Sequence, residues 1–296
     1  MQWFKKKLPT ILLVFVFLTG VALILYPTFA DWWNSFHQSR AVASYMDSVS
    51  ALDTEQYEEI LAEADAYNQK LAETGILWTL DEEQEKEYND QLNINDSGIM
   101  GYIDIPKINI TLPIYHGIDE AVLQVAIGHI AGSSLPVGGE NTHCIVSGHR
   151  GLPSARLFTD LDKLVDGDTF TMTVLNRTVT YQVDQIRIVE PTDLSDLLIE
   201  EGKDYCTLVT CTPYGINTHR LLVRGHRVAN AQGDAPVIAD AMQIETIYIA
   251  PFLAVPILIL LVIGMFILTG RQQRRNRRVK ATMDAFDFRK NDEKDE

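Results

Sequence analysis

Two long apolar runs constrain this chain more than any other feature of its 296 residues. Residues 8–30 and 247–269 are each long enough to cross a bilayer as a helix, because about 20 apolar residues span the hydrocarbon core. Three lysines precede the first run, and six arginines and lysines follow the second within 271–280. Since basic residues stay on the cytoplasmic side, we predict that both chain ends are cytoplasmic and that 31–246 lies outside.

The first run has a second interpretation, a cleaved signal peptide, because it combines a basic start with an apolar core. The sequence TFA at 28–30 is a poor small-x-small cleavage site, which favours retention as an anchor. In both interpretations the middle of the chain is exported. We interpret the basic tail as a stop-transfer signal, with a lipid or partner site as the alternative.

The exported segment is strongly acidic. The whole chain carries a formal net charge of −15, and most of its acidic residues lie in 31–246. Such a balance argues against nucleic acid as a partner, because a nucleic-acid surface requires clustered positive charge. It favours a soluble surface, and no Asp-x-Asp-x-Asp-Gly run indicates a calcium loop.

Within the exported segment the hydrophobic period changes once. From about 35 to 91 apolar residues recur at steps of three and four, with Asp53 as N-cap and Gln56 completing a capping box, which predicts helices. Beyond residue 99 the period becomes two, in seven runs: 100–105, 108–114, 143–147, 169–175, 179–189, 205–210 and 221–228. Seven or eight strands predict a closed or nearly closed β-barrel, with a hairpin turn at Asn176-Arg177.

Three chemically matched residues lie at predicted strand ends. Cys211 ends an apolar run and precedes the breaker TPYG, and His149 follows the run CIVSG in the same way. Arg220 begins the next run, so a hairpin returns its guanidinium to the rim that carries Cys211. Loops after strands are where a rigid scaffold presents reactive groups. A cysteine attacks as the thiolate, which needs a neighbouring base or cation.

Each of these residues also has an ordinary interpretation. An apolar-flanked cysteine is often a buried filler. An arginine at a strand start is often a surface charge, and a histidine after Ser-Gly is often a turn residue. Five further histidines of the predicted barrel segment compete as the base: His116, His129, His143, His219 and His226.

The stretch TLVTC at 207–211, followed by TPYGINTHRLLVRGHR, resembles the active-site signature of the sortases, membrane-tethered cysteine transpeptidases of Gram-positive bacteria. Further blocks extend the resemblance in order: YNQKL in the helical segment, MGYIDIPKINITLPIYHG at 100–117, GHIAGSSLPVGGENTH at 128–143, SGHRGLP at 147–153 and LFTDLDKL at 157–164. Together they resemble the class C, pilus-assembling branch over roughly residues 60–228. The second apolar run fits that branch as well.

The resemblance implies roles by position. Cys211 matches the nucleophile that attacks the Thr-Gly bond of an LPXTG-like sorting signal. His149 matches the histidine that protonates the leaving amine, and Arg220 the arginine that orients the substrate and holds the oxyanion. The acceptor is a lysine of the next pilin subunit, and no metal or organic cofactor is needed.

The resemblance also implies an organisation that is mainly β, an eight-stranded sortase-type barrel with short helices. The predicted parts are an N-terminal transmembrane helix (1–30), a helical collar and lid region (31–98), the catalytic barrel (99–230), a linker (231–246), a second transmembrane helix (247–270) and a tail that is basic and then acidic (271–296). The predicted partners are pilins and the plasma membrane, with a cell-wall precursor or an anchoring sortase as further possibilities. An anchoring sortase that uses a cell-wall amine and a non-catalytic two-span assembly factor are the alternative functions.

The chain departs from the class C pattern at the lid. That branch commonly carries an Asp-Pro-aromatic stretch before the barrel, but no proline occurs between Pro27 and Pro106. The nearest candidates are Trp78 and Asp81, after a helix stop at Gly75. We expect Trp78 to cover Cys211 loosely, with packing on the helical collar as its alternative role.

Two further cysteines precede the predicted catalytic residues by five positions. Cys144 and Cys206 therefore point away from the face that carries His149 and Cys211. If their strands are neighbours, the two thiols lie side by side. We expect buried, reduced side chains, because a disulfide between directly paired strands is strained.

Overall fold

The computed structural model describes residues 2–230 together with Gly264 and Arg271. The described chain divides into two compact units, one up to Tyr26 and one from Pro27 through the end of the barrel. Apart from Gly264 and Arg271, the predicted linker, the second apolar run and the tail lie outside the described residues. The two-span prediction is therefore untested at its second span.

The first helix, α1 (Gln2–Ser50), runs through position 30 without a break. From Ile11 it is long and apolar enough to cross a membrane, and it is the one such helix in the part of the chain that the structure describes. Its composition fits either a membrane anchor or a signal sequence. Beyond Pro27, α1 packs on the barrel: the Tyr45 hydroxyl donates to Met100 O at 3.1 Å and accepts from Leu175 N at 2.8 Å.

The helical collar contains two shorter helices with local start signals. Asp53 is the N-cap of helix α2 (Thr54–Thr74), and the capping box predicted with Gln56 is confirmed. Gly75, at φ 80°, ends α2 as expected for a residue that tolerates the left-handed region. Asp81 is the N-cap of helix α3 (Glu82–Asp90).

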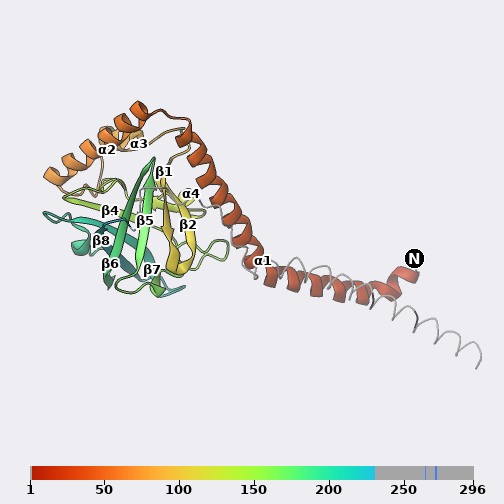
Figure 1. The fold of residues 1–296 in the computed structure, drawn as a ribbon. Coiled ribbons are helices and arrows are strands. Elements are labelled where there is room, and N and C mark those ends of the chain that lie inside the picture. The colour runs from red at the N-terminus through yellow and green to blue at the C-terminus, as the bar shows by residue number, and fades with distance from the viewer. Residues whose placement is uncertain (1, 231–263, 265–270, 272–296) are drawn as a thin grey trace, which may run out of the picture. The chain divides into compact units, whose positions relative to one another are not determined.

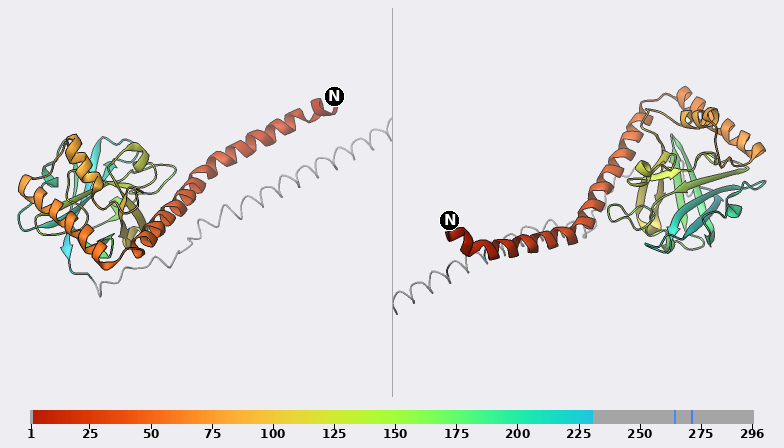
Figure 2. Two further views of the ribbon diagram at one scale, coloured as in Figure 1. Left: turned by 90° about the horizontal axis from the view of Figure 1, so that it is seen from above. Right: turned by 180° about the vertical axis from the view of Figure 1, so that it is seen from behind.

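Eight strands close into a barrel, which confirms the predicted fold (Figure 1). They are β1 (Ile99–Ile105), β2 (Ile110–His116), β3 (Ile127–His129), β4 (Thr142–Ser147), β5 (Thr169–Val174), β6 (Arg177–Val189), β7 (Asp204–Thr212) and β8 (His219–Val228), with the short helix α4 (Glu120–Leu123) before β3. The order around the barrel is β1-β2-β3-β4-β7-β8-β6-β5. Neighbours are antiparallel except β2–β3 and β4–β7. Helices α2 and α3 cross the same side of the barrel (Figure 2).

Three local predictions were wrong. Strand β3 was missed, because three residues are too short to show a period. The β5–β6 turn is Leu175-Asn176 and not Asn176-Arg177, since Arg177 pairs with Val174 and Leu175 takes the left-handed conformation at φ 52°. The run from 108 begins as a strand only at Ile110, because residues Pro106–Ile108 form a single 3-10 turn.

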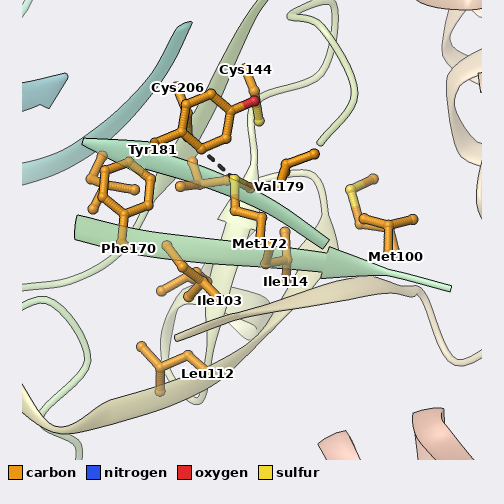
Figure 3. Close-up of a cluster of buried hydrophobic side chains, with 14 of the residues drawn as sticks. Met100, Ile103, Leu112, Ile114, Cys144, Phe170, Met172, Val179, Tyr181 and Cys206 are labelled. Atoms are coloured by element: carbon orange, nitrogen blue, oxygen red, sulfur yellow. Dashed lines mark hydrogen bonds between the residues drawn. The ribbon is translucent and has the colours of Figure 1, made fainter. Parts of the chain in front are cut away.

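The barrel interior is filled by alternate residues of each strand (Figure 3). Phe170 and Tyr181 stack there with ring centroids 5.6 Å apart. Gly225 of β8 makes room for them, since a Cβ at this position would lie 2.9 Å from each side chain. Burying such large side chains stabilises the fold by about 1.5–3 kcal/mol each.

The strand directions give the barrel two distinct ends. Strands β4 and β7 are parallel and β8 is antiparallel to β7, so β4 and β7 end where β8 begins. We call this the β7–β8 end. The opposite end carries the β5–β6 turn, the starts of β4 and β7 and the end of β8, and we call it the β5–β6 end.

Candidate active site

Cys211 and Arg220 form a direct cross-strand pair at the β7–β8 end. Side chains of residues paired in this way stand on one face with their Cβ atoms about 4.5–5.5 Å apart. Both residues are half-buried. Arg220 Nη1 donates to His219 O at 3.2 Å and to Asn217 O at 3.4 Å. One carbonyl of the β7–β8 loop and one of the first residue of β8 therefore hold the guanidinium at this end of the barrel.

His149 follows β4, the parallel neighbour of β7. Ser147 pairs with Val209, and Gly148 N donates to Val209 O at 3.1 Å, so the pairing continues past the end of β4. Continued for two residues beyond the pair of Ser147 and Val209, this register brings His149 alongside Cys211. The three predicted site residues therefore come from three adjoining strands or strand ends, in the order His149, Cys211, Arg220.

Two threonines of β7 hold the segment that carries His149. Thr210 Oγ1 donates to Gly148 O at 2.7 Å, and Arg150 Nη1 donates to Thr212 Oγ1 at 3.2 Å. Side chains alternate along a strand, so these threonines occupy the face of β7 opposite to Cys211. Sequence reasoning missed this support, whose signal was the alternation of threonine and cysteine in TCT at 210–212.

The imidazole of His149 has an acidic neighbour that the sequence did not indicate. Its Nε2 is buried without a hydrogen-bond partner and lies 3.9 Å from Glu120 Oε2. Glu120, on α4, is held by Gln124, whose amide donates to Glu120 Oε1 at 2.5 Å. Among the described residues, no hydrogen bond joins the Cys211 thiol to the His149 imidazole. Catalytic hydrogen bonds are often long without substrate and tighten when it binds.

The five competing histidines either contact polar groups elsewhere in the barrel or lie out of register with Cys211. His116 contacts Gln91 O and Gly98 O, His129 contacts Tyr88 and Ser134 O, and His143 contacts Leu198 O and Thr207. His226 lies at the β5–β6 end beside Asp184. His219 neighbours Arg220 but is paired with Thr212 and lies 3.4 Å from Glu190. Of these five histidines and His149, only His149 is in register with Cys211.

An apolar strip leads away from the Cys211–Arg220 pair on the same face of the sheet. Val209 and Leu222 are the next pair on that face, and both are buried with Ile145. Ile76, from the connection between α2 and α3, packs on this strip. Leu194 and Leu197, from the β6–β7 connection, also belong to the cluster. The strip beside the thiol is therefore covered by other side chains of the chain.

The candidate lid residues lie in the connection that contributes Ile76. Trp78 is 39% exposed. The Asp81 carboxylate accepts hydrogen bonds from Glu83 N and Gln84 N, so it caps α3. The lid role of Trp78 and Asp81 stays a prediction.

Cys144 and Cys206 pair directly across β4 and β7, and both are buried and not joined by a disulfide. The side-by-side placement and the burial predicted from the sequence are confirmed, and the reduced state stays a prediction. Both side chains belong to the barrel interior, where Cys206 Sγ lies 3.3 Å from Met172 Sδ (Figure 3). They are therefore separated by the sheet from the face that carries Cys211.

This geometry defines a class of protein, a β-barrel with a half-buried cysteine between a histidine and an arginine. The model of the sortase domain matches residues 103–228. The chain is 59% identical to sortase C1 from Streptococcus agalactiae. The match covers 65% of this chain and all of that crystal structure, with a TM-score of 0.64. It is 42% identical to Clostridium perfringens sortase C with the C-terminal cell wall sorting motif, over 65% of this chain and all of that chain, with a TM-score of 0.58.

The chain therefore belongs to the sortase family, whose members are cysteine transpeptidases, and these structural neighbours are class C sortases. Among curated proteins it is 32% identical to sortase D of Bacillus subtilis over 131 residues, which are 43% of this chain. The matched part spans 63% of that relative's length.

Proposed function

We propose that this chain cleaves an LPXTG-like sorting signal between threonine and glycine and transfers the acyl group to a lysine of a pilin subunit, which polymerises pili. The observation that carries this proposal is the register of β4, β7 and β8, which aligns His149, just after β4, with Cys211 and Arg220. Membership of the sortase family and the class C neighbours support it.

In the first step the Cys211 thiolate attacks the threonine carbonyl carbon. The bond to the glycine nitrogen breaks, and the His149 imidazolium gives its proton to the leaving amine. A thioester between Cys211 and the threonine remains. Arg220 hydrogen-bonds the negative oxygen of the tetrahedral intermediate, a role that suits a rigid and always charged donor.

In the second step a lysine amine attacks the thioester. His149, now neutral, takes the amine proton, and the carbon–sulfur bond breaks to restore the thiolate. The product is an isopeptide bond between two subunits. One of the class C neighbours is described with a C-terminal cell wall sorting motif, which supports this substrate class.

We further propose that α1 is retained as an anchor and that the barrel works on the outer face of the plasma membrane. Sortases as a family are membrane-associated, and α1 has the required length from Ile11. Anchoring holds the enzyme beside substrates that are themselves inserted in the membrane, which raises their effective concentration. A protease added to intact protoplasts should remove the segment 31–246 and spare the arginine-rich tail, whereas cleavage of the tail would contradict the second span.

The central test is to incubate the detergent-solubilised full-length protein with an LPXTG peptide and with candidate pilins. We expect a thioester adduct on Cys211 by mass spectrometry and a ladder of covalent pilin multimers. Cys211→Ala should abolish both, while Cys206→Ala serves as the control for loss of a thiol away from the site. A ladder from Cys211→Ala would overturn the enzyme proposal, and transfer to a cell-wall amine alone would favour the anchoring alternative.

A further inference from the structure

The end of the barrel that carries the candidate active site also receives the first turns of α1 beyond Pro27. Asn34 Nδ2 donates to Ser154 O at 2.8 Å, and the Asp31 carboxylate accepts from Arg156 N at 2.8 Å. Both partners lie in the segment after His149, whose own carbonyl accepts from Phe158 N. This part of α1 is thus bonded to the loop that holds the candidate catalytic histidine.

From there α1 runs along the barrel to its other end (Figure 1). Gln38 Nε2 donates to Val125 O at 2.7 Å, just before β3 begins. Tyr45 then bonds Leu175 in the β5–β6 turn. The order of these contacts gives α1 a direction: residues 31–38 lie toward the β7–β8 end, and residue 45 lies at the β5–β6 end.

The β7–β8 end of α1 is rich in exposed aromatic side chains. Phe29 is 53%, Trp33 51% and Phe36 40% exposed, and their rings cluster with Trp32. No charged residue lies between Lys7 and Asp31. An apolar run that ends in tryptophan and other aromatic residues is typical of a helix leaving the hydrocarbon core, because these rings favour the headgroup layer.

The barrel continues this apolar character at the same end. Tyr214 and Ile216, in the β7–β8 loop, are 61% and 67% exposed. Tyr214 also borders the loop to which α1 is bonded, since a Cβ on Gly151 would lie 2.9 Å from its ring. Exposed apolar groups gathered around one region indicate an apolar partner.

The β5–β6 end is different. It contains an open cavity of about 980 Å³ whose lining includes Asp65, Glu140, Arg177, Lys203 and Asp204. Charged groups of both signs line this cavity, so that end is suited to water. The β5–β6 end therefore carries a charged cavity, whereas exposed aromatic side chains of α1 and of the β7–β8 loop lie toward the end that carries Cys211.

We propose that the β7–β8 end of the barrel rests in the headgroup layer of the bilayer, held there by Phe29, Trp33 and Phe36 of α1 and by Tyr214 and Ile216 of the β7–β8 loop. This inference rests on the membrane anchoring proposed above. It orients the thiol of Cys211 toward the membrane surface, so that a sorting signal reaches it while its own protein is still inserted. A signal far from the membrane does not share this advantage in effective concentration.

The test uses the full-length protein in vesicles of phosphatidylcholine and phosphatidylglycerol that contain lipids brominated near the headgroup or near the chain end. Variants with one tryptophan each report depth by fluorescence quenching. The first retains Trp33, with Trp3, Trp32 and Trp78 replaced by phenylalanine. The second and third lack all four natural tryptophans and carry Tyr214→Trp or Leu198→Trp. Leu198 is the matched control, because it is 51% exposed and its carbonyl contacts His143 near the β5–β6 end.

We expect headgroup-level bromine to quench Trp33 and the tryptophan at 214 at least about twofold more than the tryptophan at 198. Equal quenching at 214 and 198, with Trp33 still quenched, would overturn the orientation and leave the anchoring intact. Failure of every variant to float with the vesicles would overturn the anchoring, and the orientation with it. Cooperative unfolding of each variant in urea, at the wild-type midpoint, reports that the barrel has remained folded.

Discussion

Cys211 of β7 faces Arg220 of β8 directly across the hairpin that joins the two strands. The loop between them is short, and carbonyls of Asn217 and His219 hold the guanidinium. Backbone pairing of two neighbouring strands thus brings together the proposed sulfur nucleophile and the proposed oxyanion donor.

Replacing Arg220 with lysine should disable the enzyme. A lysine keeps the charge but loses the planar, forked donor geometry, and removal of an oxyanion donor lowers rates by about 10²–10³. The measurement is the rate of adduct formation on Cys211 with a sorting-signal peptide. Arg187→Lys is the control, because Arg187 is mostly exposed and lies 3.7 Å from Asp196. A near-normal rate in Arg220→Lys would remove Arg220 from the proposed mechanism.

Cys144 and Cys206 should remain reduced and unreactive in the folded protein. Both are buried, and burial raises the pKa of the Cys206 thiol, which keeps it protonated. A thiol reagent should therefore modify only Cys211 in the native protein and all three cysteines after denaturation. A mass gain of two hydrogens on reduction, traced to the peptides of Cys144 and Cys206, would show a disulfide instead.

Removing the side chain that is predicted to cover the active site should expose Cys211 to reagents. We expect Trp78→Ala to accelerate alkylation of Cys211 by a small reagent, because the indole is predicted to cover the thiol loosely. Ile76→Ala is the informative comparison, since Ile76 packs on the apolar strip beside the thiol. Unchanged labelling in Trp78→Ala, with faster labelling in Ile76→Ala, would assign the cover to Ile76 and Trp78 to packing.

Acidification should destabilise the fold through His143. This side chain is fully buried, and burial lowers its pKa from the ordinary 6.5 to about 4. Between those values the unfolded chain binds a proton that the folded chain does not, so the free energy of unfolding falls as the pH falls. The full difference of pKa corresponds to about 3 kcal/mol.

Urea unfolding at pH 7 and at pH 4.5 measures this contribution. His143→Gln lacks the titrating group but retains an amide able to bond Leu198 O and Thr207, so its stability should fall less on acidification. Equal losses in the variant and the wild type would place the acid sensitivity elsewhere, for example at His116, whose pKa is also lowered by burial.

Several features followed from the sequence because local chemistry decides them. The capping box of Asp53 and Gln56 and the stop at Gly75 involve residues within one turn of a helix. The strands that alternate over five or more residues were found, since a period of two reveals which side chains face the core. The pairing of Cys211 with Arg220 followed from a hairpin, in which chain neighbours become strand neighbours.

Other features were decided by tertiary structure alone. Strand β3 is three residues long and becomes a strand only because β2 and β4 offer it hydrogen bonds. The parallel pairing of β4 with β7 joins segments about 60 residues apart, and no local pattern predicts that register. It is this register that brings His149 to Cys211, lets Thr210 bond Gly148 and sets Cys144 beside Cys206. The sequence determined the candidate site residues, whereas closure of the barrel, which pairs distant strands to satisfy their backbone hydrogen bonds, decided that they lie close together.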